Sequence, residues 1–437
     1  MKRIILKKGE EERILRGHPW VYGNEVERIL EGKGDAADAA ELVAGELADV
    51  ESVGRRYLGR ALVNPASKIL ARLVGPSKEG VDVGFFKRRI RRAVERRLAL
   101  GMDPRAVSCR LVFAEADFLP GLVIDCFAGW SFDDVQRAAL PRPLDCSALE
   151  GALGPPEKVL SVQILTFAME ARIPLILQAM NETLPRFLGA DAPPAVIEKV
   201  SRIMREKEKI PEREALRQGA IPPNGLVIFE NGLPFVVDLE GGQKTGHYLD
   251  QRENRLFARR FAGKRTLDAF CYSGGFAIHA ARGGAEETLA VDSSKSALDL
   301  VEKNALLNNV QDRIKTIQAD VFDLLTGYER AKERFDAIIL DPPSFASSMA
   351  NLESAAAGYK EINLKALKML NEGGVLITCS CSRAMTEARF KRMILEAAHD
   401  AERRLIQTDF RPQAGDHPIL LGYDESFYLK CGVYTAV

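Results

Sequence analysis

In the second half of the chain, short apolar runs alternate with longer amphipathic stretches. The runs that we predict as strands are Thr266–Phe270, Glu287–Asp292, Ile314–Asp320, Phe335–Asp341 and Gly373–Ser382. Helices are predicted between them, from Phe276 and over 296–308. This alternation is typical of a parallel sheet covered by helices on both faces. Pro418–Leu421 and Phe427–Tyr434 predict two further strands, which we expect to be antiparallel.

The first half of the chain has a different rhythm. Residues 1–75 alternate apolar and polar positions over short distances with glycine breaks, which predicts a small β-rich domain or barrel. Residues 83–100 place apolar side chains at helical spacing. Arg110–Phe113, Gly121–Asp125 and Leu160–Leu165 are strand-like, and residues 134–157, rich in Pro, Ala and Asp, look like an excursion. Val227–Asp238 predicts a hairpin around Asn231-Gly232.

These patterns divide a chain of 437 residues into three predicted domains. The first is a β-barrel domain over 1–78, and the second an α+β domain over 79–220. The third, over 221–437, is an α/β domain of Rossmann-like type with a mostly parallel sheet. Hydrophobic residues at 46% and charged residues at 28% describe a globular protein, and no apolar run is long enough to cross a bilayer.

Charge and cysteine usage exclude several classes of protein. The 61 basic and 61 acidic residues cancel, so a nucleic-acid partner would have to meet a local basic surface. The helix over 83–100 offers one, with seven Lys and Arg against Glu95 alone. A solvated helix face is the alternative for these charges. The seven cysteines form no CxxC pair, so we expect free thiols in the cytoplasm and no metal site.

Candidate cofactor chemistry lies at the ends of the predicted parallel strands. Ser273-Gly274-Gly275 joins a strand to a helix, where glycine allows the backbone to approach a ligand. Asp292, Asp320 and Asp341 end the next three strands. Carboxylates there can accept ribose hydroxyls but would repel phosphates, so S-adenosylmethionine suits this edge better than NAD or ATP. Each Asp taken singly could instead be a helix N-cap.

A candidate nucleophile follows the last parallel strand. Gly373–Ser382 ends in Cys379-Ser380-Cys381-Ser382, where ligands of open α/β sheets bind. The two cysteines are two residues apart, so on a strand they would face the same side. We interpret Cys381 as the nucleophile and Cys379 as a packed core thiol. From the strand alone, a buried structural cysteine at 381 is an equal alternative.

Six segments together resemble a known family across nearly the whole chain. They are Arg16–Tyr22, Gly242–Arg252, Phe270–Phe276, Asp341–Phe345, Gly358–Asn363 and Ser380–Ser382. The C-terminal half resembles class I S-adenosylmethionine-dependent methyltransferases. The whole chain is similar to the bacterial ribosomal RNA cytosine-C5 methyltransferases that modify large-subunit RNA and carry an N-terminal PUA domain. It departs from their pattern near 126–160, where it carries an insertion.

The resemblance implies roles for individual residues. Cys381 would add to C6 of cytosine, and Asp341 would hydrogen-bond the base near N3. S-adenosylmethionine would be bound by Gln251, Arg252, Tyr272, Ser273, Gly274, Gly275, Asp292, Ser293, Asp320, Asp341 and Pro342. The resemblance implies large-subunit ribosomal RNA as the partner and no membrane. Whether the protein forms a homodimer is left open.

Three alternatives compete with this interpretation. The first is an RNA methyltransferase that acts on a base nitrogen without a cysteine nucleophile. The second is an RNA-binding assembly factor whose cofactor fold is inactive, against which the intact acids and Cys381 argue. A small-molecule methyltransferase is the third, and it leaves the PUA-like segment and the basic helix unexplained.

Overall fold

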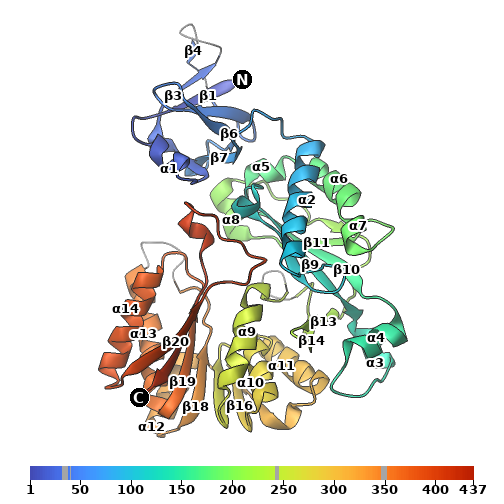
Figure 1. Cartoon of the computed structure of the whole chain (residues 1–437), viewed down its shortest axis with the longest axis vertical. Coiled ribbons are helices and arrows are strands. Elements are labelled where there is room, and N and C mark those ends of the chain that lie inside the picture. Colours follow the sequence, from blue (N-terminus) through green and yellow to red (C-terminus); the bar gives the residue numbers. More distant parts are fainter. Residues whose placement is uncertain (32–37, 40, 242–245, 346–351) are drawn as a thin grey trace.

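The computed structural model describes the chain except for residues 32–37, 40, 242–245 and 346–351. It contains three seven-stranded sheets, which follow one another along the sequence and lie in separate regions of the molecule (Figure 1). The α/β composition predicted from the hydrophobic pattern is confirmed. Within the described residues, no helix is long and apolar enough to cross a membrane.

The N-terminal sheet confirms the prediction of several short strands. Its strands are β1 (Lys2–Leu6), β2 (Trp20–Tyr22), β3 (Val26–Glu31), β4 (Asp38–Ala39), β5 (Leu47–Glu51), β6 (Tyr57–Val63) and β7 (Ile69–Gly75). Their order is β2-β7-β6-β5-β1-β3-β4, and helix α1 (Glu11–Leu15) lies between β1 and β2. Alternate strand residues such as Ile4, Val50 and Val63 are fully buried, because one face of each strand turns into the domain core.

The middle domain is built on a sheet of order β12-β11-β10-β9-β13-β14, to which β8 adds by pairing with β9. The strands are β8 (Cys109–Phe113), β9 (Leu122–Ser131), β10 (Glu157–Ile164), β11 (Ala195–Glu198), β12 (Arg217–Gln218), β13 (Leu226–Glu230) and β14 (Leu233–Val237). The helices are α2 (Val83–Ala99), α3 (Phe132–Arg137), α4 (Cys146–Leu153), α5 (Phe167–Glu170), α6 (Ile173–Thr183), α7 (Pro185–Leu188) and α8 (Arg202–Glu208).

The excursion predicted between residues 134 and 157 is a connection within one antiparallel strand pair. Strand β9 pairs with β10 from Glu157↔Gly129 onward, and α3 and α4 occupy the chain between them. The hairpin predicted over 227–238 is also confirmed. Asn231 and Gly232 both have positive φ, at 53° and 78°, as its two-residue turn requires. The hairpin pairs with β9, so it extends the middle sheet. The domain boundaries themselves stay a prediction.

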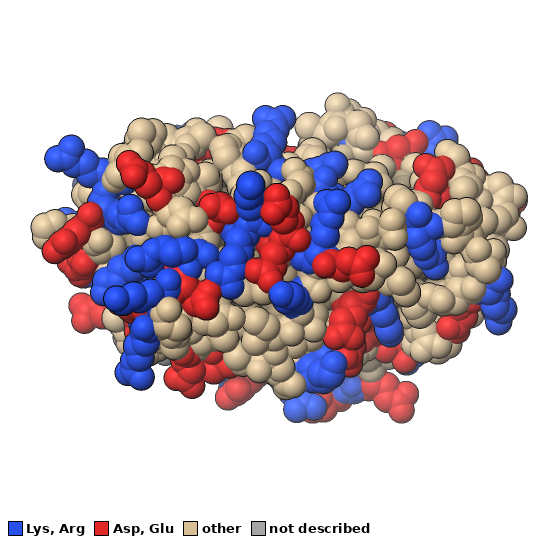
Figure 2. All heavy atoms as spheres, turned by 90° about the horizontal axis from the view of Figure 1, so that it is seen from below, with Lys and Arg blue, Asp and Glu red and all other residues tan. Residues whose placement is uncertain are grey.

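The basic helix predicted over 83–100 is α2, and its charges are mostly paired within the protein. Asp82 caps it by accepting a hydrogen bond from the Phe85 amide at 2.7 Å. Six of its seven basic residues form ion pairs with acids, namely Lys87, Arg88, Arg89, Arg91, Arg96 and Arg97. Figure 2 shows another face of the molecule, where Lys and Arg lie interspersed with Asp and Glu. These pairings favour the structural alternative for the charges of α2.

The C-terminal sheet has the order β17-β16-β15-β18-β19-β21-β20, with β21 antiparallel to β19 and the first five strands parallel. Its strands are β15 (Arg265–Ala269), β16 (Glu287–Asp292), β17 (Ile314–Gln318), β18 (Phe335–Leu340), β19 (Leu370–Ser380), β20 (Leu405–Arg411) and β21 (Lys430–Ala436). The helices are α9 (Arg252–Ala258), α10 (Gly275–Gly283), α11 (Lys295–Leu307), α12 (Val321–Arg330), α13 (Leu352–Met369) and α14 (Glu387–Asp400). Helices α9 to α11 cover one face and α12 to α14 the other (Figure 1).

One predicted strand of this domain is wrong. Pro418–Leu421 is not a strand, and the strand before β21 is β20, over Leu405–Arg411. Proline at 418 has no amide hydrogen for a ladder. The segment instead turns, with the Tyr423 amide donating to the Leu420 carbonyl at 3.0 Å. It packs against the N-terminal domain so closely that a Cβ on Gly17 would lie 2.7 Å from the Leu421 carbonyl oxygen.

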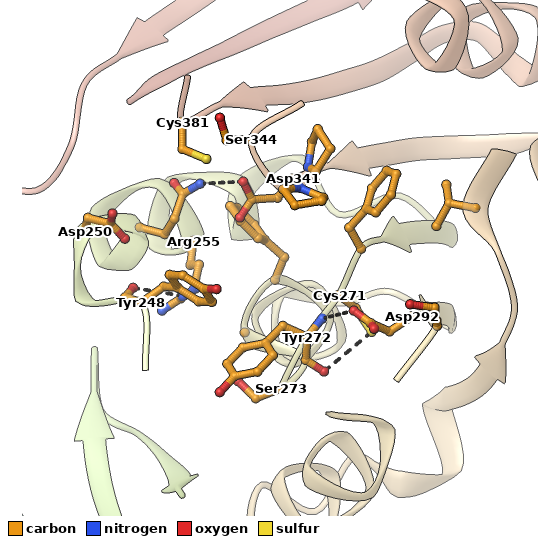
Figure 3. A pocket seen from close by; sticks show the side chains of 18 of the residues that line it. Tyr248, Asp250, Arg255, Cys271, Tyr272, Ser273, Asp292, Asp341, Ser344 and Cys381 are labelled. Carbon is orange, nitrogen blue, oxygen red and sulfur yellow. Dashed lines mark hydrogen bonds between the residues drawn. The ribbon is translucent and has the colours of Figure 1, made fainter. Parts of the chain in front are cut away.

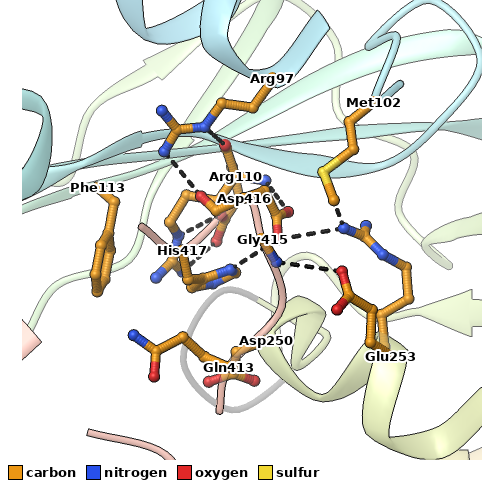
Figure 4. Close-up of polar contacts among 12 residues, drawn as sticks. Arg97, Met102, Arg110, Phe113, Asp250, Glu253, Gln413, Gly415, Asp416 and His417 are labelled. Carbon is orange, nitrogen blue, oxygen red and sulfur yellow. Dashed lines mark hydrogen bonds and ion pairs between the residues drawn. The ribbon is translucent and has the colours of Figure 1, made fainter. Parts of the chain in front are cut away.

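A buried carboxylate, Asp416, joins the middle and C-terminal domains (Figure 4). Its side chain accepts a hydrogen bond from the Arg110 amide at 2.8 Å and pairs with Arg252 at 3.2 Å and His417 at 2.9 Å. The Asp416 carbonyl oxygen accepts from Arg97 at 2.8 Å. Burial alone would raise the pKa of Asp416, but the charges of His417 and Arg252 hold it well below its usual value.

We therefore expect Asp416→Asn to destabilise the protein by about 3 kcal/mol, because it breaks a buried ion pair and leaves Arg252 without its counter-charge. Urea unfolding followed by fluorescence measures this change. Asp299→Asn is the matched control, because its exposed pair with Lys295 should contribute less than about 0.5 kcal/mol. Equal midpoints for the two variants would contradict a joining role for Asp416.

Candidate active site

A cavity of about 520 Å³ opens at the carboxyl ends of the parallel strands of the C-terminal sheet (Figure 3). This volume lies within the range of roughly 300–1,000 Å³ that small-molecule sites occupy. The strand order reverses here, between β15 and β18, so the loops after these strands diverge and leave a crevice. Of the residues predicted for the site, those that line the cavity are Gln251, Tyr272, Ser273, Gly275, Asp292, Ser293, Asp320, Asp341, Pro342 and Cys381.

The loop after β15 bends sharply to form one wall. Phe270 and Tyr272 have positive φ, at 64° and 47°, and Gly274 has φ 77° as the N-cap of α10. This left-handed backbone costs glycine little but strains other residues. The turn is held from two sides, because the Tyr272 amide donates to Asp292 at 3.0 Å and the Asn304 side chain donates to the Ser273 carbonyl at 2.8 Å. Gly274 thus shapes the turn without lining the cavity.

The acids at the strand ends lie around this one cavity, as predicted. Asp292 accepts hydrogen bonds from the Tyr272 and Ser294 amides, which fixes its carboxylate beside the glycine turn. Asp320 is also the N-cap of α12, since it accepts from the Phe322 amide at 2.8 Å. The N-cap alternative is therefore correct for Asp320, and the same side chain still lines the cavity.

The described lining of the cavity is acidic. It holds four carboxylates, from Asp250, Asp292, Asp320 and Asp341, against one cation, Arg255. The guanidinium of Arg255 is neutralised by Glu230 at 2.8 Å, so it contributes little positive charge to the cavity. Such a lining disfavours phosphates and suits a ligand that carries positive charge and hydroxyl groups.

Asp341 lies at the end of β18 and is held by a chain of side-chain amides. Gln251 donates to Asp341 Oδ1 at 2.9 Å, and Asn254 donates to Gln251 Oε1 at 2.7 Å. Pro342 and Pro343 follow at once and restrict the backbone of this loop. Asp341 therefore presents its carboxylate to the cavity in an orientation fixed by α9.

The two cysteines of β19 have separate environments. Cys379 is fully buried within the strand, opposite Cys431 on β21. β19 ends at Ser380, so Cys381 lies just beyond it and its side chain, half-buried, lines the cavity across from the glycine turn. The two thiols thus differ in burial, and their common facing stays a prediction.

Arg252, which was predicted to bind the cofactor, does not line the cavity. It points to the middle domain, where it donates to the Ser108 carbonyl at 2.9 Å and pairs with Asp416. On a helix, Gln251 and Arg255 share a face at i and i+4, while the next residue after Gln251 does not. Arg255 is the cation that lines the cavity. The spacing groups it with Gln251, but only the docking of α9 decides which face of the helix meets the cavity.

Among the other lining residues that the sequence did not predict are Tyr248, Asp250 and Leu429. Tyr248 and Asp250 belong to the predicted motif segment 242–252, of which residues 242–245 lie outside the described structure. Leu429 arrives from the far end of the chain. The Tyr428 hydroxyl before it donates to Asp250 at 2.5 Å, which joins the C-terminal segment to the cavity wall.

Comparison with known proteins agrees with this geometry. Residues 157–406 match the family model of S-adenosylmethionine-dependent methyltransferases, and residues 4–75 match that of PUA-like domains. The chain is 36% identical over 432 residues to ribosomal RNA large subunit methyltransferase I of Escherichia coli, with 98% of each chain covered. Its identity to the protein of the same name from Aeromonas salmonicida is 38% over 430 residues, covering 98% and 97%.

Two solved structures share the fold over the whole chain. They are a SAM-dependent methyltransferase from Streptococcus mutans, with a TM-score of 0.76, and SMU.776 complexed with SAH, with a TM-score of 0.77. Each is 22% identical and is covered completely. The matches confirm the predicted PUA-like domain, the class I methyltransferase fold and the cofactor, S-adenosylmethionine.

We expect Gly275→Ala to weaken cofactor binding by at least about tenfold. A Cβ at this position would lie 2.5 Å from Arg255 Nε and 2.9 Å from Arg255 Cδ, and Glu230 fixes that side chain. Arg255 must then move into the cavity or lose its pair. Isothermal calorimetry with SAH measures the affinity.

Gly327→Ala serves as the control, since a Cβ there meets nothing within 4 Å and α12 gains a better helix former. An unchanged SAH affinity in the Gly275 variant would show that the turn tolerates a side chain and is not a tight cradle.

Proposed function

The chain belongs to the family of S-adenosylmethionine-dependent methyltransferases that includes ribosomal RNA large subunit methyltransferase I, and we propose that it methylates C5 of a cytosine in large-subunit ribosomal RNA. The reaction proceeds through a covalent adduct between Cys381 and C6 of the base. The observation that carries this proposal is the position of Cys381, whose side chain and that of Asp341 line the same cavity as the glycine turn.

The ribosomal substrate is supported by relatives that align from end to end. Their names specify large-subunit ribosomal RNA, and the alignments cover 98% of this chain, including its PUA-like domain. Both the N-terminal and the catalytic regions are therefore shared. A ribosomal RNA substrate also supports the cytoplasm as the proposed location.

The residues of the cavity fit the cofactor. Asp292 lies beside the glycine turn at the end of the second strand, where a carboxylate can accept hydrogen bonds from ribose hydroxyls. Tyr272, Ser273 and Gly275 provide the wall of the turn, with Ser293, Asp320 and Pro342 around it. The four carboxylates suit the positive sulfonium. S-adenosylmethionine bound there supplies an electrophilic methyl group.

Cys381 supplies the activation that cytosine needs. C5 of the free base is a poor nucleophile. When the Cys381 thiolate adds to C6, a C6–S bond forms and the ring becomes an enamine whose electron pair is available at C5. C5 gains the methyl group as the bond between that methyl and the sulfonium sulfur breaks. A base then removes the C5 proton, and the electron pair of the C5–H bond restores the C5=C6 double bond as the C6–S bond breaks and the sulfur leaves as thiolate.

Asp341 orients the base and stabilises the adduct. Its carboxylate faces the cavity from β18, next to the strand that carries Cys381, and Gln251 holds it at 2.9 Å. When protonated, the Asp341 carboxyl can donate a hydrogen bond to N3, and this stabilises the negative charge that builds up on the ring when the thiolate adds. Gln251 thus serves as a positioning residue for Asp341.

We expect Cys381→Ala to reduce methyl transfer by more than about 10³-fold, within the range seen when a catalytic nucleophile is removed. SAH affinity should remain within a factor of about two, because the thiol is not needed to hold the cofactor. Transfer of labelled methyl groups to ribosomal RNA, and calorimetry with SAH, measure the two effects. RNA containing 5-fluorocytidine should form a denaturant-resistant adduct with the wild type only.

Cys146→Ala is the matched control, since this thiol is exposed and lies outside the cavity. It should keep full activity. Retained transfer in the Cys381 variant would contradict carbon methylation and indicate chemistry at a base nitrogen.

A strain that lacks the protein should lose one 5-methylcytidine from its large-subunit ribosomal RNA. Mass-spectrometric mapping of methylated nucleotides, with and without a plasmid copy of the gene, measures this loss. Complementation by the wild type but not by the Cys381 variant is expected. An unchanged map would exclude the ribosomal assignment.

A further inference from the structure

A buried lysine lies behind the turn that carries Cys381. Lys430 is the first residue of β21, and in the antiparallel ladder it pairs with Ser380, the last residue of β19. Its side chain is 1% exposed. The ammonium donates hydrogen bonds to the Ser382 carbonyl at 2.7 Å and to the Tyr428 carbonyl at 2.8 Å. It therefore lies against the short segment between Ser380 and Ser382, of which Cys381 is the middle residue.

This ammonium has no carboxylate partner among the described residues, since none forms an ion pair with Lys430 within 4.0 Å. A buried cation is costly unless a negative charge compensates it, and two backbone carbonyls provide only partial compensation. Burial lowers the pKa of Lys430 to about 8, and the negative charge of Cys381 opposes this fall. Cys381 is the anionic group that opposes the effect of burial on the Lys430 pKa.

Three phenols and a carboxylate lie around the thiol. Tyr248, Tyr359 and Tyr428 lie close enough for the Cys381 charge to raise their pKa values, although burial is the main cause in each. Asp341 lines the same cavity from β18. A thiolate among phenols and a carboxylate would be destabilised unless a cation lay near it. Lys430 fills that need.

We propose that Lys430 is a positioning residue that holds Cys381 as a reactive thiolate, the two forming a charge pair at the end of the β19–β21 ladder. The hydrogen bond to the Ser382 carbonyl fixes the turn, and the positive charge stabilises the sulfur anion. Thiolates next to lysine form at lower pH than free cysteine. The proposal rests on the assigned role of Cys381, but its test reads the thiol and not methyl transfer.

The test is the pH dependence of alkylation of Cys381 by iodoacetamide between pH 5.5 and 10, because only the thiolate reacts. Trypsin should release Met369–Arg383, which contains Cys379 and Cys381, and tandem mass spectrometry separates the two labels. We expect a wild-type midpoint below the ordinary cysteine value of about 8.5. Lys430→Met should raise it by at least about one pH unit, which slows alkylation at pH 7 about tenfold.

Two variants separate an electrostatic role from a structural one. Lys430→Arg keeps the charge and should keep the midpoint within about half a pH unit of the wild type. Lys264→Met removes a charge on a side chain that is 81% exposed. Lys264 lies just before β15, at the amino-terminal end of the parallel strands and away from Cys381, so the midpoint should not change. A lysine needed only for packing would lower thermal stability in the Met variant without moving the midpoint.

The proposal is overturned if the wild-type midpoint is at or above about 8.5, or if Lys430→Met binds SAH normally and titrates like the wild type. If that variant does not fold, the wild-type and Lys430→Arg profiles decide. Full methyl transfer by Cys381→Ala, together with a low wild-type midpoint, would instead remove the proposed nucleophile and leave the charge pair standing.

Discussion

The reversal of strand order between β15 and β18 is the constraint on which the rest of this structure depends. The helices after β15 and β16, α10 and α11, cover one face, and those after β17 and β18, α12 and α13, cover the other, so the sheet leaves a crevice at its carboxyl edge. Asp292 and Asp320, which follow β16 and β17, therefore line one cavity with Asp341 and Cys381, which follow β18 and β19.

The C-terminal segment connects this cavity to the rest of the molecule. It begins in the Asp416 cluster with the middle domain, and Tyr423 then packs against Trp20 of the N-terminal domain with ring centroids 4.9 Å apart. It returns to the cavity through Tyr428, Leu429 and Lys430. One length of chain thus contacts the PUA-like domain, the middle domain and the site itself. This continuity gives the PUA-like and middle domains a fixed position relative to the cavity.

The two sides of the cavity carry different charges. Carboxylates surround the region beside the glycine turn, where a cationic cofactor suits them, and Arg255 is neutralised by Glu230. On the side of Cys381, the buried Lys430 provides positive charge from behind the turn. In the proposed reaction a sulfonium and a thiolate have opposite electrostatic needs, and the carboxylates and Lys430 meet them from different directions. The charges of α2 are mostly paired with acids, so a cluster of Arg and Lys in the sequence does not by itself indicate an RNA surface.

The sequence by itself determined the strand–helix alternation, the acids at the strand ends and the position of Cys381 after β19, because periodicity and glycine placement are local properties. It could not show that Arg252 turns to Asp416 while Arg255 enters the cavity, since this depends on how α9 docks. Nor could it show that Pro418–Leu421 packs against Gly17, or that Lys430 lies beside the turn of Cys381. Those contacts join residues far apart in the chain. Only the tertiary packing of three domains decides which buried charge meets which partner.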